Sequence, residues 1–244
     1  GYTFKGWDPE VPSTMPAENL TLVAQWEAIE YTITYHLDGG TNDGANPANY
    51  TIESATIILN AATKTGYTFD GWYDAETGGT KVESIPQGTT GDKALYARWI
   101  ANQYTVTFDA QGGTVNPETK QVTYDSPYGE LPVPEREGYT FDGWYTAEVG
   151  GSKITAEDKV STADSHTLYA HWTVNQYTIS FDSAGGTEVA AITLDYGEAV
   201  TPPANPTKTG YTFKGWDPEV PSTMPAEDLT LVAQWEAIEY SITY

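Results

Sequence analysis

The sequence predicts a mostly β fold, with at most a small α component, in which small repeats follow one another as an elongated rod. The first observation is that Gly1–Tyr35 returns as Gly210–Tyr244 with only two changes. The second is the motif Gly-Tyr-Thr-Phe, which occurs four times, at Gly1, Gly66, Gly138 and Gly210. The third is an alternation of apolar and polar residues, which is typical of strands. Repetition on this scale is typical of rods, stalks and fibres.

Each repeat begins at a tyrosine and ends at a tryptophan, because the same pattern occurs at both ends of every copy. The first, second and third repeats are residues 31–99, 104–172 and 177–235; a half-repeat, the C-terminal half of one unit, occupies 1–26, and residues 240–244 begin another. The four-residue linkers each contain an apolar residue, namely Ile29, Ile100, Val174 and Ile238. We expect these residues to dock on a neighbouring repeat, to restrict swivelling and to contribute to stability.

The strands of one repeat follow in order from these patterns. Tyr31, Ile33 and Tyr35 alternate with polar residues and predict the opening strand, and a Gly-Gly pair then supplies a turn. The second strand is predicted at Ile57–Leu59, Val122–Tyr124 and Ile192–Tyr196 of the three repeats. Proline-rich crossings follow, where proline excludes a central strand. The Gly-Tyr-Thr-Phe motif forms the third strand, and a Leu-x-Ala-x-Trp pattern forms the closing strand.

The third repeat is shorter than the other two. It lacks about nine residues between its tryptophans, Trp216 and Trp235, where the long repeats carry Glu76–Lys81 and Glu148–Lys153. A shortened hairpin tip is therefore predicted in the third repeat.

The acidic composition of the chain makes some classes of binding partner unfavourable. The chain has 34 acidic and 11 basic residues, for a formal net charge of −23. Nucleic acid and anionic surfaces are poor partners for a chain without a basic patch. The acidity itself has two explanations: solubility of a long exposed array, or calcium bound by carboxylates. The candidate calcium cluster is Asp217, Glu219, Glu227 and Asp228, although no D-x-D-x-D loop occurs.

The sequence contains no pattern that indicates an enzyme. G-x-S-x-G, G-x-G-x-x-G and the phosphate-binding G-x-x-x-x-G-K-[ST] motif are all missing. The three histidines, His36, His166 and His171, lack the spacing of a metal site. We therefore expect no catalytic residues and no cofactor apart from the calcium considered above. The longest apolar stretch, Ile57–Ala62, is too short to cross a bilayer, so this segment should not insert into a membrane.

The aromatic residues divide into predicted core and predicted contacts. The repeated tryptophans recur at fixed places and are expected to fill the core or pack between repeats rather than stack on sugars: Trp72, Trp99, Trp144, Trp172, Trp216 and Trp235. Tyr73 and Tyr145 follow the first tryptophan of each long repeat and are replaced by Asp217 in the short one. These tyrosines, with Glu76 and Lys81 of the adjacent loop, are the candidate exposed contacts.

The order of motifs in the second repeat resembles a known family. Tyr104–Thr114, Glu137–Thr146, Gly150–Ile154 and Thr167–Trp172 together resemble the Listeria–Bacteroides repeat, to which the internalin B-repeat also belongs. The resemblance covers all three repeats and the half-repeat. It implies a β-grasp fold, although no helical periodicity marks the helix that such a sheet usually holds. It also implies tandem repeats in a bacterial surface protein.

Three functions are compatible with these observations. The leading hypothesis is a structural spacer or fibre-forming segment of an extracellular stalk or filament at the bacterial cell surface. The alternative is an adhesin that binds a host protein or a neutral glycan through exposed loops such as Glu76–Lys81. The third is self-assembly, in which open strand edges pair between copies of the same protein.

Overall fold

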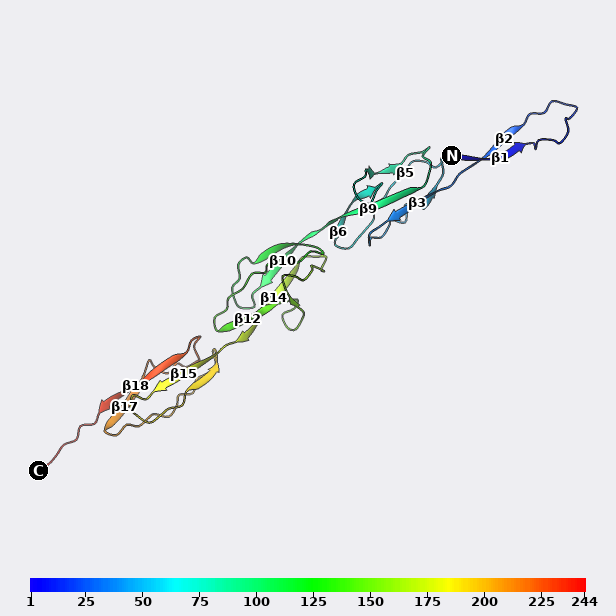
Figure 1. The fold of residues 1–244 in the computed structure, drawn as a ribbon. Coiled ribbons are helices and arrows are strands. Elements are labelled where there is room, and N and C mark those ends of the chain that lie inside the picture. The colour runs from blue at the N-terminus through cyan, green and yellow to red at the C-terminus, as the bar shows by residue number, and fades with distance from the viewer. The chain divides into compact units, whose positions relative to one another are not determined.

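The computed structural model describes residues 1–244 and contains eighteen β-strands and no helix (Figure 1). Without a helix, the chain has none that is long and apolar enough to span a membrane. It divides into two compact units. The first contains Gly1–Tyr104, Val122–Ser126 and Lys159–Asp164, and the second contains Thr105–Gln121, Pro127–Asp158 and Ser165–Tyr244.

The first unit contains the half-repeat and the first repeat. The half-repeat is the antiparallel hairpin of β1 (Tyr2–Asp8) and β2 (Val23–Ala28). The first repeat forms a five-stranded sheet in the order β4-β3-β9-β6-β7 and a small separate sheet of β5 and β8. The bounds of its strands are β3 (Tyr31–His36), β4 (Asn49–Tyr50), β5 (Ile57–Ile58), β6 (Tyr67–Tyr73), β7 (Lys81–Val82), β8 (Ser84–Ile85) and β9 (Lys93–Ala101).

The second unit contains the third repeat and most of the second repeat. The sheet of the second repeat has the order β11-β10-β14-β12-β13, and that of the third has the order β16-β15-β18-β17. The bounds of the strands are β10 (Gln103–Asp109), β11 (Thr119–Thr123), β12 (Tyr139–Tyr145), β13 (Lys153–Ile154), β14 (His166–Val174), β15 (Gln176–Asp182), β16 (Ile192–Asp195), β17 (Tyr211–Asp217) and β18 (Leu229–Ala237).

All three sheets share one topology. The opening strand lies parallel to the closing strand at the centre, as β3 with β9, β10 with β14 and β15 with β18. The Gly-Tyr-Thr-Phe strand pairs antiparallel with the other side of the closing strand. The register shifts just before the glycine of the Gly-Trp pair in every copy, including the half-repeat. This confirms the prediction of mostly β repeats, and no helix accompanies the sheets.

The strand predicted at Ile57–Leu59 forms as β5 (Ile57–Ile58), but it does not pair with the opening strand of the repeat. The sequence pointed to Ile57–Leu59, but the strand that pairs with β3 is Asn49–Tyr50, with Tyr31 opposite Tyr50. Tyr50 is 4% exposed, and its ring lies 5.7 Å from that of Tyr31. Ile57 instead belongs to the small β5–β8 sheet and packs on the same core from outside the main sheet. An apolar run indicates burial here, but it does not say in which sheet the residues pair.

Each repeat has its own core around a phenylalanine and two tryptophans. Trp72, Trp144 and Trp216 are 2%, 2% and 9% exposed. The second tryptophan of each repeat is half-buried, and its indole Nε1 donates to a carbonyl after the opening strand: Trp99 to Leu37, Trp172 to Ala110 and Trp235 to Ser183, at 3.0, 2.9 and 2.9 Å. In the first repeat the Phe69 ring lies 5.3 Å from both indoles, in edge-to-face geometry.

The short repeat lacks one edge strand. In the long repeats, β7 and β13 pair with the ends of β6 and β12. The third repeat has no such strand after β17, as the missing residues predict. The chain there folds back so that Met224, at 1% exposure, joins the core beside Ile179 and Leu231.

Candidate functional site

The outer face of the first long repeat carries planar side chains in a row across the strands. Leu95 and Ala97 of β9 are buried, so Tyr96 between them points to the opposite face. Its register partners are His36 on β3 and Tyr73 on β6. We call the following residues the first tyrosine row: His36, Tyr96, Tyr73 and Lys81.

The second repeat has an equivalent row on its own sheet. We call the following residues the second tyrosine row: Asp109, Tyr169, Tyr145 and Lys153. In the short repeat, Asp182, Val232 and Asp217 occupy the equivalent positions. The tyrosine rows are therefore a property of the long repeats alone.

The first tyrosine row is held by stacking and hydrogen bonds. The His36 and Tyr96 rings are stacked, with centroids 4.3 Å apart. The Arg98 guanidinium lies 3.7 Å from the centre of the Tyr73 ring. Tyr73 Oη donates to the Asp70 carboxylate at 2.8 Å, and this hydrogen bond is the main cause that raises the pKa of Tyr73. Tyr73 is half-buried, and these contacts hold its ring in place.

The same position anchors the hairpin loop in both long repeats. Arg98 donates to the carbonyls of Ala75, at 3.2 Å, and Gly78. In the second repeat, His171 stacks on Tyr145 with centroids 3.9 Å apart, and its Nε2 lies 3.0 Å from the Ala147 carbonyl oxygen. Arg98 and His171 each stack on a row tyrosine and contact the backbone of the loop, so row and loop are organised together.

The predicted contact residues lie at this surface, but they are not equally free. Glu76 is exposed in the loop, and Lys81 at its end donates to the Asp70 carbonyl. A groove of about 940 Å³ runs beside the row and is lined by His36, Tyr96, Arg98, Glu76, Lys64 and Asp38, among others. The sequence reasoning missed Tyr96 and Tyr169. The alternation that placed Leu95, Ala97 and Trp99 inward already put Tyr96 on the outer face.

Every basic side chain has a partner within the chain. Lys64 forms an ion pair with Asp38 at 3.2 Å and lies over the Tyr67 ring. At the equivalent positions, Arg136 donates to the Gln111 carbonyl at 3.0 Å and Lys208 to the Ala184 carbonyl at 2.8 Å. The other eight also donate to carbonyls or carboxylates: Lys5, Lys81, Lys93, Arg98, Lys120, Lys153, Lys159 and Lys214. These cations hold turns and strand ends, and no basic patch gathers for an anionic ligand.

The acidic residues are spread along the chain. No group of three or more His, Asp or Glu side chains lies close enough together to hold a metal ion. Asp228, from the candidate calcium cluster, accepts a hydrogen bond from the Thr178 amide at 2.7 Å. In the first repeat, Asp92 accepts from the Thr32 amide at 2.8 Å. This hydrogen bond from the backbone is the main cause that lowers the pKa of Asp92. Calcium binding remains a prediction, which direct titration of the protein with calcium would test.

Comparison with known proteins identifies the family. The Listeria–Bacteroides repeat domain matches residues 31–98, 104–171 and 177–234. The chain belongs to the Listeria–Bacteroides repeat family. Its repeats are similar to internalin H of Listeria monocytogenes, with 39% identity over 71% of this chain and 30% of internalin H. The resemblance inferred from the motifs is thus confirmed.

Two proteins of Evansella cellulosilytica are also similar. One, described as a Gly-rich membrane protein, is 32% identical over 100% of this chain and 30% of its own length. The other, described as a membrane protein, is 34% identical over 92% of this chain and 34% of its own length. The chain therefore spans about a third of the length of the curated relatives it matches.

Proposed function

We propose that this Listeria–Bacteroides repeat segment is a structural spacer in an extracellular stalk or filament at the bacterial cell surface. The observation that carries the proposal is that all three repeats share their sheet topology and core, whereas their outer surfaces differ. Every repeat keeps the parallel central pair, the shifted register and the Phe-Trp-Trp core. The tyrosine rows, in contrast, occur in two repeats and not in the third. The part common to all repeats is the scaffold, as a spacer requires.

The chemistry of the side chains agrees with this role. The basic groups are engaged in turns, and the carboxylates outnumber them 34 to 11. A surface with this charge keeps a long array soluble and prevents repeats from collapsing on one another. The names of the relatives, which include membrane proteins and internalin H, support a location at the cell envelope.

The spacer role is tested by separating length from surface in the full-length protein on cells. One variant lacks residues 104–176, which is one repeat with its linker. The other keeps every repeat but carries the short repeat's residues at the rows: Tyr73→Asp, Tyr96→Val, Tyr145→Asp and Tyr169→Val. We expect the deletion to reduce antibody access to the distal end of the protein and the row variant to leave access unchanged. Equal loss in both variants would contradict the spacer role.

The tyrosine rows support a second candidate, an adhesin for a neutral glycan or a host protein. Planar side chains in a fixed row beside a groove offer stacking surfaces for sugar rings or for an extended peptide. The engaged cations make an anionic ligand a poor fit. The test is a binding screen of the purified chain against neutral glycans and host proteins, with the same row variant as control. Binding that the row variant loses supports the adhesin, whereas binding that the row variant retains excludes the rows.

Fibre formation belongs to the same proposal and has its own test. Copies of the chain would associate through the open edges of their sheets. Electron microscopy of the native material distinguishes a fibre from separate molecules, and monomers at all accessible concentrations would exclude the fibre.

A further inference from the structure

Where one repeat meets the next, the same positions come together three times. We call each set a joint. It consists of the Gly-Tyr pair of one repeat, the third residue of the linker, and the first two turn residues after the second strand of the next repeat. The first joint contains Gly1, Tyr2, Ile29, Ile52 and Glu53. The second contains Gly66, Tyr67, Asn102, Tyr124 and Asp125. The third contains Gly138, Tyr139, Asn175, Tyr196 and Gly197.

The linker residue of the second and third joints is hydrogen-bonded on both sides. The Asn102 amide donates to the Gly66 carbonyl at 2.9 Å, and the Asn102 carbonyl accepts from the Tyr124 amide at 2.9 Å. Asn175 does the same between Gly138 and Tyr196, at 2.9 and 2.8 Å. In the first joint the Ile29 amide donates to the Gly1 carbonyl at 2.9 Å, but the bond from Ile52 is missing. Two joints are therefore closed by backbone and one is half-open.

The asparagine side chain adds contacts that isoleucine cannot make. In the second joint, Thr68 Oγ1 donates to Asn102 Oδ1 at 2.6 Å, and Asn102 Nδ2 donates to the Tyr104 hydroxyl at 3.3 Å. The third joint repeats both bonds, through Thr140 and Tyr177, at 2.5 and 3.3 Å. In the first joint the polar contact is Tyr2 Oη donating to Glu53 at 3.0 Å. The second joint has the counterpart of this bond, from Tyr67 Oη to the Asp125 carboxylate at 3.1 Å, so the contacts through the asparagine are what distinguish the two joints.

Aromatic packing separates the joints in the same way. Tyr67 and Tyr124 meet edge to face with centroids 5.5 Å apart, and Tyr139 and Tyr196 do so at 6.0 Å. A methyl group on Gly66 or Gly138 would overlap the facing tyrosine ring, and one on Gly1 would overlap the Ile52 side chain. All three glycines are therefore closely packed, and the first joint differs in having an aliphatic side chain in place of the aromatic ring. The strands agree: only Asn102 separates β9 from β10, whereas two residues, Ile29 and Glu30, separate β2 from β3 (Figure 1).

The structure also corrects the predicted docking residues. Ile100 was expected to dock on a neighbouring repeat, but its side chain is 58% exposed. The polar residue two positions later makes the contact. In the second linker hydrophobicity thus pointed to the wrong residue, because that joint is closed chiefly by hydrogen bonds, whereas Ile29 is the joint residue of the first linker and is half-buried.

We propose that the linker residue sets the stiffness of each joint, so that asparagine joints are locked and isoleucine joints are hinges. Gly210 and Ile238 repeat Gly1 and Ile29, and the Ile238 amide donates to the Gly210 carbonyl at 2.9 Å. That surface is thus of the hinge type, and it fits the turn after the second strand of a repeat that carries Ile at the position of Ile52. The array would consist of blocks of three repeats separated by hinges. The biological purpose of the hinges rests on the proposed spacer role, but their stiffness is measured independently.

The test measures distance distributions between spin labels, because the chain has no cysteine of its own. Cysteines replace exposed strand residues on either side of each joint: Thr3 with Thr34 for the first, Thr34 with Thr107 for the second, and Thr107 with Ser180 for the third. We expect a broad distribution for the first pair and narrow distributions for the other two. Equal widths in all three would overturn the proposal.

Two exchanges of residues make the test decisive. Asn102→Ile with Tyr124→Ile should broaden the second distribution, and Ile29→Asn with Ile52→Tyr should narrow the first. Simple destabilisation cannot narrow a distribution, so the second exchange remains informative even if the first damages folding. Because a hydrogen bond is worth about 1 kcal/mol, the Ile52→Tyr amide should exchange with solvent several-fold more slowly after the second exchange than the Ile52 amide does before it. Unchanged width and exchange would overturn the proposal while leaving the test of the spacer role intact.

Discussion

The half-repeat and the end of the third repeat are nearly the same sequence in two surroundings. Both form a hairpin with the same register and the same shift before the Gly-Trp pair. In both, the phenylalanine ring lies 5.2–5.5 Å from two indoles. Yet Trp7 is 43% exposed and Trp216 9%, while Met15 is 93% exposed and Met224 1%. The hairpin and its aromatic cluster are thus set locally, and burial is not.

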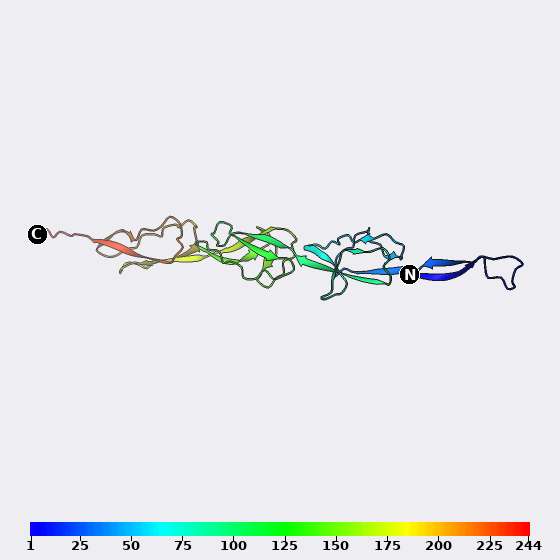
Figure 2. The ribbon, with the colours of Figure 1, turned by 90° about the horizontal axis from the view of Figure 1, so that it is seen from above.

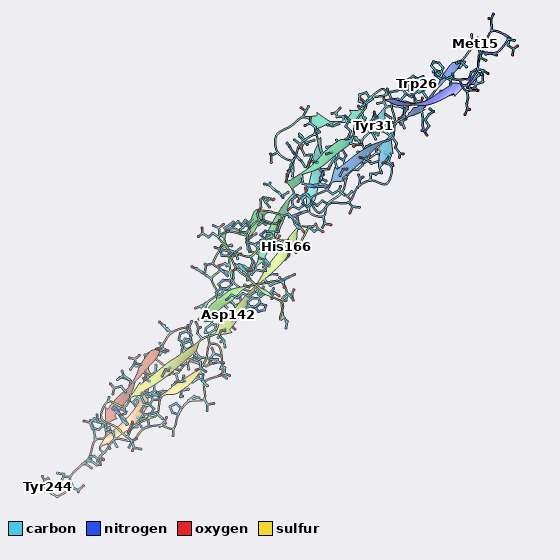
Figure 3. The ribbon with its side chains drawn as sticks, turned by 45° about the vertical axis from the view of Figure 1, so that its right-hand side comes forward. Met15, Trp26, Tyr31, Asp142, His166 and Tyr244 are labelled. Atoms are coloured by element: carbon cyan, nitrogen blue, oxygen red, sulfur yellow. The ribbon has the colours of Figure 1, made fainter.

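The difference comes from the first half of the repeat. In the third repeat, Ile179 on β15 and Val200 pack against Trp216, Met224 and Leu231. The half-repeat has no such strand: β1 pairs with β2 alone (Figure 2). Met15 projects from the loop between these two strands, far along the hairpin from Trp26 (Figure 3). The opening half of a repeat therefore converts an aromatic hairpin into a closed core.

Removing the equivalent tryptophans tests this conclusion with the largest expected effect. Trp216→Ala should destabilise the third repeat by about 3–5 kcal/mol, because it removes a buried indole from a packed core. Trp7→Ala should cost much less, because a large part of that indole is already in water. Hydrogen exchange of β15 and β18 on one side, and of β1 and β2 on the other, measures the two costs separately. Similar costs would mean that the exposed hairpin has a core of its own.

The two methionines sharpen the comparison at a smaller scale. Met224→Ala should cost about 2–4 kcal/mol and Met15→Ala less than about 0.5 kcal/mol, since only Met224 leaves a cavity. Chemical denaturation followed by hydrogen exchange measures both, in β18 for Met224 and in β1 and β2 for Met15. Dilute peroxide provides a check without mutation, because it should oxidise Met15 well before Met224. Oxidation of both at one rate would show that the third core opens readily.

The sequence predicts this contrast only in part, for a physical reason. The period-two alternation around Tyr177 and Trp235 depends on which face meets a core, so it identified the opening and closing strands. It could not assign Asn49–Tyr50 to the main sheet, because a two-residue strand has too short a period to detect. It also could not find the joints, whose residues Asn102 and Asn175 are polar and act through hydrogen bonds. Tyr96 was predictable by alternation, but the stacking with His36 was not, because it depends on pairing between distant strands.

Replacing the glycine before the third strand by alanine should have a moderate effect on stability, and two of these glycines can be compared directly. Gly138 and Gly210 have nearly the same φ, +76° and +82°, but only Gly138 faces a tyrosine ring. Alanine should cost about 1–2 kcal/mol at Gly210, from the left-handed backbone alone. Gly138→Ala should cost more, because the methyl group must also displace Tyr196. Hydrogen exchange measures the two costs, at the Tyr196 amide for Gly138→Ala and at the Ile238 amide, which donates to the Gly210 carbonyl, for Gly210→Ala. Equal costs would show that the ring moves aside freely.

Acid should distinguish the first repeat from the half-repeat. Asp92 and Asn19 hold the same place before a closing strand, and the pKa of Asp92 is lowered by the hydrogen bond from the Thr32 amide. A lowered folded-state pKa gives stability that is present above the ordinary aspartate pKa of about 3.9 and is lost as the pH falls through the folded value. Protection of the Thr32 amide should therefore fall below about pH 4. Asp92→Asn should make that protection less sensitive to acid in the same range, and an unaltered profile would assign the acid response to other carboxylates.

The smallest expected effect comes from one of the two differences between the repeated segments. Asp228 accepts a hydrogen bond from the Thr178 amide at 2.7 Å, and the half-repeat has Asn19 in its place. Asp228→Asn keeps an oxygen acceptor but removes its charge, so the loss should be below about 1 kcal/mol. Asp228→Ala, which removes the acceptor, is the control and should cost more. Exchange of the Thr178 amide measures both. If asparagine and alanine proved equally costly, the charge of Asp228 would be what holds the opening strand. The half-repeat, which has Asn19 at this position, could then not hold an opening strand in the same way.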